Sequence, residues 1–197
     1  IENGSTGYYD KAVLTKLSLR IDFDDKIALL GKNGEGKSTL SKLLADRIPL
    51  LSGSLTKSSQ LRIGYFSQHQ TDELRKNETP FELLSRARPN KSVSERKKIL
   101  GGFGISSDQS ELKVSAMSGG QKARLLLLLA TLDNPHLLIL DEPTNHLDIE
   151  SREALIEALT KFSGAVVLVI HDFHLLSLVS EKLWLVKNGS VNPYEED

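Results

Sequence analysis

The chain has 197 residues, with 25 basic and 26 acidic side chains, 39% apolar residues and no cysteine. Its length suits one domain, or one domain with a small lobe, and its composition excludes a disordered chain and a disulfide scaffold. The net charge of −1 excludes a protein that is basic overall. The longest largely apolar run, residues 125–132, is too short to cross a bilayer, so we expect no membrane insertion.

The first third of the chain, residues 1–66, has the pattern of strands separated by turns. Residues 18–23 alternate between polar and apolar, which predicts a strand with Leu19, Ile21 and Phe23 on one face. Two further strands are expected, a short apolar one that runs into glycines and an alternating one, at residues 26–30 and 61–66.

The remainder of the chain changes character twice. Residues 72–117 are polar and helix-forming, which predicts an inserted helical lobe within a single domain that covers residues 1–197. Residues 119–131 are apolar nearly all round, as in a buried helix. Two continuous apolar strands, typical of a parallel sheet covered on both faces, are expected at residues 136–140 and 165–170. Alternating strands and helices indicate an α/β fold.

A glycine-rich segment follows the strand at residues 26–30 and precedes a helical stretch at residues 39–46. It matches the P-loop pattern, in which backbone amides point at phosphate oxygens and a helix N-terminus adds positive potential. An ordinary glycine-rich turn is the alternative, and the flanking strand and helix argue against it. The predicted nucleotide contacts are Gly31, Lys32, Asn33, Gly34, Glu35, Gly36, Lys37, Ser38 and Thr39.

Within this segment, Lys37 is expected to reach the β- and γ-phosphates, and the hydroxyl of Ser38 to bind Mg²⁺. A second acidic site is expected where the strand at residues 136–140 ends in Asp141 and Glu142. In a P-loop protein such an Asp completes the Mg²⁺ shell, and the neighbouring Glu can act on the attacking water. A solvated Asp-Glu turn is the simpler interpretation of this pair when it is taken alone.

The segment Ser118-Gly119-Gly120-Gln121 lies between these two sites. Ser118 is a good N-cap for the helix that follows, so a capped helix is the simple interpretation. In this order with both phosphate motifs, the segment resembles the signature of ATP-binding-cassette (ABC) ATPases, although Met117 stands where that family usually has Leu. The resemblance implies an α/β P-loop NTPase fold of ABC type. Such a fold has a mostly parallel core sheet, an N-terminal antiparallel β part and an inserted helical lobe.

Further residues match the functional positions of the ABC family in chain order. Gln68 resembles the Q-loop glutamine, Asp148 ends a segment that resembles the D-loop, and His171 resembles the switch histidine. Tyr8 matches the aromatic residue that stacks on adenine, with Tyr9 as a rival for that role. A lone histidine after a strand is more often structural, but the place of His171 in this order favours the functional interpretation.

The segment Asn145-His146-Leu147-Asp148 indicates the kind of cassette. Transporter cassettes commonly have Ser-Ala-Leu-Asp there, whereas Asn-His-Leu-Asp is typical of the soluble, two-cassette ABC-F proteins. Gln68 and Ser118 are only 50 positions apart, so the lobe lacks the arm often inserted in the first cassette. Since the chain also begins with Ile1 rather than Met, the resemblance implies a fragment, the second, C-terminal cassette. The switch segment departs from the usual Ser-His-Asp-Arg by having Ile170 and Phe173.

The resemblance also implies a reaction, in which ATP and water give ADP and phosphate, slowly in an isolated cassette. The cofactors are ATP and Mg²⁺, and the metal is held by Ser38, Gln68 and Asp141. Glu142 polarises the attacking water, and His171 contacts the γ-phosphate. The residues from Ser118 to Gln121 cap ATP on a second cassette, from the same polypeptide or from a homodimer.

The same resemblance implies a cytoplasmic protein whose conformational cycle acts on the ribosome in translation, and the lack of cysteine fits a reducing compartment. Two other functions remain open. The chain could be the ATPase subunit of a membrane transporter, or a cassette used in DNA maintenance or as a nucleotide-gated scaffold.

A local basic segment bears on the partner. Residues 86–98 contain six cations and the single acid Glu95, a net charge of +5. Such a cluster can contact RNA phosphates even where the whole protein is nearly neutral. A solvated helix face is the simpler interpretation, and both stay open from the sequence.

Overall fold

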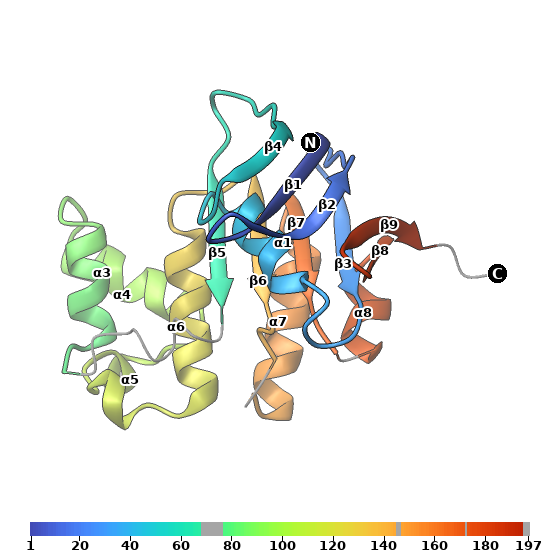
Figure 1. Cartoon of the computed structure of the whole chain (residues 1–197). Helices are drawn as coiled ribbons and strands as arrows, with labels where there is room; N and C mark the ends of the chain where they lie inside the picture. Colours follow the sequence, from blue (N-terminus) through green and yellow to red (C-terminus); the bar gives the residue numbers. More distant parts are fainter. Residues whose placement is uncertain (68–76, 145–146, 172, 195–197) are drawn as a thin grey trace.

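The structure, a computed structural model, describes residues 1–67, 77–144, 147–171 and 173–194, and it contains two sheets. The larger sheet has six strands in the order β5-β6-β7-β3-β8-β9 (Figure 1). Neighbouring strands are parallel from β5 to β8, and only β9 is antiparallel to its neighbour. In sheet order these strands are β5 (Ile63–Ser67), β6 (Leu137–Asp141), β7 (Ala165–Val169), β3 (Lys26–Leu30), β8 (Lys182–Lys187) and β9 (Ser190–Tyr194).

The smaller sheet is antiparallel and formed by the N-terminal part of the chain. It has the order β2-β1-β4, with β1 (Glu2–Tyr8), β2 (Lys11–Leu17) and β4 (Leu50–Ser54). Tyr9 and Asp10 have φ angles of 50° and 61° and connect β1 to β2. Two residues with positive φ are what a tight hairpin turn between twisted strands requires. The mostly parallel core sheet and the antiparallel β part are as expected.

The strand predicted at residues 18–23 is wrong. These residues lie outside both sheets, and although Leu19 is buried, Phe23 is 82% exposed. A turn replaces the strand: the Asp22 amide donates to the carboxylate of Asp25 at 3.0 Å, and the Asp25 amide donates to the Asp22 carbonyl at 3.3 Å. A side chain that satisfies a nearby backbone amide in this way competes with strand pairing.

The two faces of the core sheet carry separate apolar clusters. On β6, Leu137 and Ile139 join one cluster, and Leu138 and Leu140 join the other, as the alternation of side chains along a strand requires. The first face is covered by α1 (Lys37–Leu44), which also contacts β1 and therefore lies between the two sheets. The second face is covered by helices that include α6 (Gly119–Thr131), whose bounds are those predicted.

Two further helices, α7 (Ile149–Lys161) and α8 (Phe173–Val179), follow α6 along the second face (Figure 1). The helix α6 approaches β5 closely, since a Cβ atom added to Gly64 would lie 2.3 Å from the carbonyl oxygen of Ala130. Within the described ranges, no helix has the combination of length and apolarity that crossing a bilayer requires.

The described residues between β5 and α6 form short helices at one side of the core, at the left of Figure 1. Three of them begin with a capping box, in which side chain and backbone satisfy each other's amides. Leu84, Leu100 and Ile105 join these helices to the cluster around α6. The elements are α3 (Pro80–Ala87), α4 (Val93–Gly102), α5 (Ser107–Ser110) and the 3₁₀ helix η1 (Val114–Ala116).

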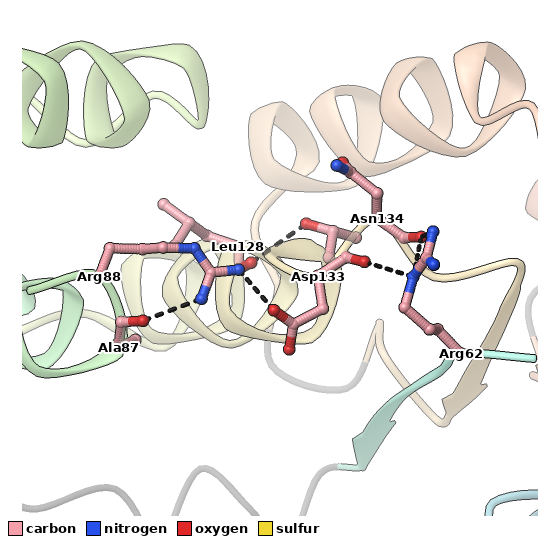
Figure 2. Close-up of polar contacts among 7 residues, drawn as sticks. Arg62, Ala87, Arg88, Leu128, Asp133 and Asn134 are labelled. Carbon is pink, nitrogen blue, oxygen red and sulfur yellow. Dashed lines mark hydrogen bonds and ion pairs between the residues drawn. The ribbon is translucent and has the colours of Figure 1, made fainter. Parts of the chain in front are cut away.

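Two arginines from different parts of the fold meet at the turn after α6 (Figure 2). Arg88, at the end of α3, forms an ion pair of 2.5 Å with the carboxylate of Asp133. Arg62, just before β5, donates from Nε to the carbonyl of Asp133 at 2.9 Å and from Nη2 to that of Asn134 at 3.1 Å. The turn that follows α6 is thus held both by the short helices and by the segment that leads into the core sheet.

Candidate functional site

The predicted site residues gather where the parallel strands end. The phosphate-loop segment follows β3, Asp141 is the last residue of β6, and His171 lies two residues beyond β7. In open α/β sheets, ligands bind at this carboxyl edge. Residues up to 140 positions apart in the sequence, from Gly31 to His171, therefore face the same region.

The phosphate loop rests on neighbouring strands at both of its ends. Gly31 has a φ of +145°, and an added Cβ would lie 2.3 Å from the carbonyl oxygen of Val186 in β8. Gly36 has a φ of +107°, and its added Cβ would lie 2.8 Å from Leu14 Cδ2 in β2. A side chain at Gly31 would collide with backbone, and at both positions the positive φ is one that residues with side chains rarely adopt, which explains the glycines there.

The loop ends at the N-terminus of α1, whose N-cap is Gly36 and makes no side-chain cap bond. The first amides of a helix lack partners within the helix, and the helix dipole favours an anion near them. Lys32, Asn33 and Gly34 form the exposed tip of the loop, whereas Thr39 is buried behind it. This arrangement can bind phosphate oxygens.

Lys37 lies within the loop and is only 5% exposed. Its ammonium donates to the carbonyl of Gly31 at 2.7 Å and to that of Lys32 at 3.1 Å. Burial lowers the pKa of Lys37, while the carboxylates of Glu142, Asp141 and Glu35 act in the opposite direction. The cation is thus held at the loop, close to the acidic end of β6.

Ser38 and Asp141 form a pair of hard oxygen ligands. The hydroxyl of Ser38 donates to Asp141 Oδ1 at 3.2 Å, and Asp141 is 7% exposed. Mg²⁺ is commonly bound by one or two protein oxygens together with substrate phosphates and water. A hydroxyl and a carboxylate beside a phosphate loop therefore fit this metal.

Glu142 and His171 face each other from the ends of two adjacent strands. His171 Nε2 lies 3.5 Å from Glu142 Oε1, and the side chains are 50% and 31% exposed, respectively. Glu142 has a φ of +53°, which turns the chain away from the strand direction immediately after Asp141. Its amide remains tied to the core by donating to the Val169 carbonyl at 2.8 Å. The two adjacent carboxylates therefore have different surroundings, one buried and one partly open to solvent.

The two tyrosines that compete for an adenine ring differ in their surroundings. Tyr8 ends β1 and is 37% exposed, and the ammonium of Lys42 in α1 lies 5.6 Å from the centre of its ring. Tyr9 is in the hairpin turn and fully exposed. Tyr8 is thus the one packed beside the helix that begins at the phosphate loop.

The signature segment caps α6. The hydroxyl of Ser118 accepts from the amide of Gln121 at 3.2 Å, and the side chain of Gln121 accepts from the amide of Ser118 at 2.9 Å. Ser118 and Gly119 are exposed, while Gly120 is buried. The start of α6 and the loop before α1 lie apart in the same molecule (Figure 1). The structure therefore does not bring these signature residues to the chain's own phosphate loop.

Comparison with known proteins shows which family this chain is similar to. A family model described as "ABC transporter" matches residues 14–145. The chain is 44% identical to the probable ATP-binding protein YheS of Escherichia coli K12 over 197 residues, which are 100% of this chain and 31% of YheS. It is 42% identical to ATP-binding cassette sub-family F member 3 of Mus musculus over 95% of this chain and 27% of that protein. It is 38% identical to GCN20 of Saccharomyces cerevisiae over 99% of this chain and 26% of that protein.

The chain belongs to the ABC-F family of ATP-binding cassette proteins. It spans about a third or less of the length of these relatives. The fold also matches a solved structure of the ATP-binding cassette MJ0796, a dimeric post-hydrolysis state bound to ADP and Pi. The TM-score is 0.79 at 22% identity, over 100% of this chain and 98% of that one, so this likeness shows the fold.

Some predicted site residues of this ABC-F cassette are not placed. Gln68 lies outside the described residues, as do Asn145 and His146 of the segment that resembles the D-loop. Asp148 is described and comes just before α7, where its carbonyl accepts from the amide of Arg152 at 3.0 Å.

The sequence reasoning missed one contact of the phosphate loop. Glu35, predicted to contact nucleotide, has its carboxylate against the amide of Asn188, at 2.7 Å. Asn188 and Gly189 form the turn between β8 and β9, with φ angles of 51° and 73°. An Asn-Gly pair between alternating apolar residues is a strong hairpin signal, so this turn could have been predicted. Its contact with Glu35 had no signal in the sequence.

The basic segment at residues 86–98 is largely engaged within the cassette. Arg86 pairs with Glu78 at 2.5 Å, and Lys91 pairs with Glu95 at 2.9 Å. Arg96 donates to the carbonyls of Arg88 and Pro89 and so fixes the end of α3 against α4. These contacts favour a structural role for several of these cations over a free basic patch.

Proposed function

We propose that this cassette binds Mg²⁺-ATP and hydrolyses it to ADP and phosphate. The observation that carries the proposal is the contact of 3.2 Å between Ser38 and Asp141. It joins the helix of the phosphate loop to the acidic end of β6 through two oxygen groups that suit Mg²⁺. The family membership supports ATP as the nucleotide.

The residues of the chain have separate tasks in this proposal. Lys37 and the amides of residues 31–39 bind the phosphates and stabilise the charge that develops on the transferred group. Ser38, Asp141 and Gln68 would hold Mg²⁺, which neutralises charge between the β- and γ-phosphates when it is bound. Tyr8 stacks on the adenine ring.

Glu142 accepts a proton from the attacking water. Its partly open position beside His171, at 3.5 Å, supports this assignment. A general base must reach the water by a hydrogen bond, and Glu142 follows the strand that carries Asp141. His171 orients the γ-phosphate and the water. The positive φ of Glu142 turns the chain after Asp141, which supports different roles for these two neighbouring carboxylates.

A second cassette completes the site. The exposed N-terminus of α6, with Ser118, Gly119, Gly120 and Gln121, caps ATP held by the partner, and Asp148 contributes to the same interface. The start of α6 lies apart from the loop before α1 in the same molecule (Figure 1), which supports this assignment. The match to a cassette whose structure is dimeric supports it as well.

For the whole protein, we propose the second, C-terminal cassette of a cytoplasmic ABC-F protein that acts on the ribosome in translation. Within it, residues 1–197 form a single nucleotide-binding domain with a helical lobe at about residues 72–117. The greater length of the relatives leaves room for another cassette. Co-sedimentation of the full-length Glu142→Gln protein with ribosomes, with and without ATP, tests this proposal. A protein that pellets with membranes instead would favour the transporter ATPase.

A further inference from the structure

The phosphate loop is fastened to a distant hairpin turn by Glu35. Oε2 of Glu35 accepts a hydrogen bond of 2.7 Å from the amide of Asn188, 153 positions later in the chain. Asn188 and Gly189 connect the paired residues Lys187 and Ser190 of β8 and β9. The first amide of such a two-residue turn is not used by the strand ladder, so it is available to an acceptor from another segment.

The same turn is fixed from its other side. Its Gly189 carbonyl accepts from the amide of Thr15 in β2 at 2.8 Å. The preceding residue of β2, Leu14, is the one against which Gly36 packs at the end of the phosphate loop. The turn, β2 and the loop thus form a closed arrangement in which each part contacts the other two.

The loop needs such support because its own conformation is costly. Gly31, Gly34 and Gly36 all have positive φ angles, and glycine loses more conformational freedom on ordering than any other residue. A contact that orders the loop before the ligand arrives reduces the entropy lost on binding.

We propose that Glu35 is a positioning residue for nucleotide binding. Its carboxylate fixes the conformation of the phosphate loop by accepting a hydrogen bond from the Asn188 amide. This inference rests on the proposed binding of ATP at the loop. The side chain of Glu35 then acts through the backbone and makes no contact with the nucleotide.

The bond and the charge of Glu35 have opposite effects, which makes the inference testable. Glu35 belongs to the phosphate loop itself, so its negative charge repels phosphate oxygens that bind there. Removing only the charge relieves repulsion of phosphate and favours binding. Removing the hydrogen bond releases the loop and disfavours binding. Glu35→Gln removes the charge and keeps an acceptor oxygen, whereas Glu35→Ala removes both.

The experiment compares these two variants with the unaltered chain and with Glu2→Ala, which removes an exposed carboxylate from β1. Titration with a fluorescent ATP analogue is expected to show a Kd about 3- to 10-fold higher for Glu35→Ala, the loss typical of one charge-assisted bond at a partly exposed site. Glu35→Gln and Glu2→Ala are expected to stay within about twofold of the unaltered chain. In steady-state kinetics, KM should rise for Glu35→Ala while kcat stays unchanged.

Hydrogen exchange of the Asn188 amide in the nucleotide-free chain tests the contact by itself. Exchange should be faster in Glu35→Ala and unchanged in Glu35→Gln. Unaltered affinity in Glu35→Ala would overturn the inference, and so would a Gln variant that binds as weakly as the Ala variant. If the unaltered chain binds no ATP, the proposed function fails. If the Asn188 amide exchanges at the same rate in Glu35→Ala as in the unaltered chain, the contact itself is refuted.

Discussion

His171 Nε2 lies 3.5 Å from Glu142 Oε1, although the two residues follow different strands of the core sheet. The strands β6 and β7 are adjacent and parallel, with Asp141 paired to Val169. The pair is therefore built by strand register: the residues just past the two strand ends come together because the strands end at the same level.

The first prediction concerns Glu142. Glu142→Gln should preserve ATP binding and slow hydrolysis by roughly 10²- to 10⁴-fold, the usual contribution of a positioned base. The amide keeps the shape of the carboxylate but accepts a proton poorly. Phosphate release and nucleotide titration on the same preparation measure the two effects. Size-exclusion chromatography should show an ATP-dependent dimer in the variant. Turnover equal to that of the unaltered chain would remove Glu142 from the mechanism.

The second prediction concerns Lys37. Lys37→Ala should abolish tight ATP binding, because it removes the ammonium held at the loop by the carbonyls of Gly31 and Lys32. Fluorescent-nucleotide titration measures the loss. Lys98→Ala, which removes an exposed ammonium from α4, is the matched control and should bind ATP normally. Equal affinities for the two variants would contradict the phosphate-loop assignment.

The third prediction separates the two tyrosines. Tyr8→Ala should weaken ATP binding more than Tyr9→Ala, because Tyr8 lies beside α1 and a lost aromatic stack is worth about 0.5–1.5 kcal/mol. Titration of ATP against both variants gives the ranking. Weaker binding by Tyr9→Ala than by Tyr8→Ala would move the adenine site to the hairpin turn.

The fourth prediction concerns the chain in isolation. It should bind Mg²⁺-ATP but hydrolyse it slowly, with a specific activity that rises with protein concentration. The reason is that α6 begins apart from the loop before α1 (Figure 1), and Ser118, the N-cap of α6, is exposed. Phosphate release measured over a wide range of protein concentration tests the dependence. Rapid turnover that is independent of concentration would show that one cassette is sufficient.

The fifth prediction concerns pH and the pair formed by Asp25 and Lys182. Burial raises the pKa of Asp25, but hydrogen bonds from Lys182, at 2.5 Å, and from the Asp22 backbone outweigh burial and leave the pKa below 3.8. The ionised carboxylate therefore stabilises the fold at pH values above about 3.8, and this contribution is lost as the pH falls through the folded-state pKa.

Asp25→Asn should accordingly lower the free energy of unfolding at pH 7 by roughly 1–2 kcal/mol and flatten its pH dependence below pH 4. Urea unfolding at several pH values measures both effects. The exposed neighbour Asp24 provides the control, since Asp24→Asn should leave the acid limb of the profile in place. An unchanged acid limb in Asp25→Asn would assign the dependence to other groups.

Much of the fold could be predicted because the decisive patterns are local. The helix at residues 119–131 and the strand at residues 26–30 have the predicted bounds. Three further elements differ from prediction by two residues or fewer at each end: β5, β6 and β7. Full burial on both faces gives a continuous apolar run, which is hard to confuse with a loop.

What could not be predicted depends on contacts between distant residues. The alternation at residues 18–23 suggested a strand, but the bonds of Asp25 with Asp22 and Lys182 impose a turn there. The contact between Glu35 and Asn188 exists only because β8 places its turn beside the phosphate loop. A local sequence pattern carries no information about such contacts between distant residues.

The packing of α6 against the core sheet determines how this helix can move. Its 13 residues span roughly 20 Å, and the leucines at its centre are buried. Ser118 caps one end, and the turn at the other end is bound by Arg62 and Arg88. A helix packed at crystal-like density cannot bend locally without opening voids, so it moves as a unit. A displacement of Ser118, in the signature segment, would therefore also displace Asp133, in the turn at the opposite end of the helix that Figure 2 shows.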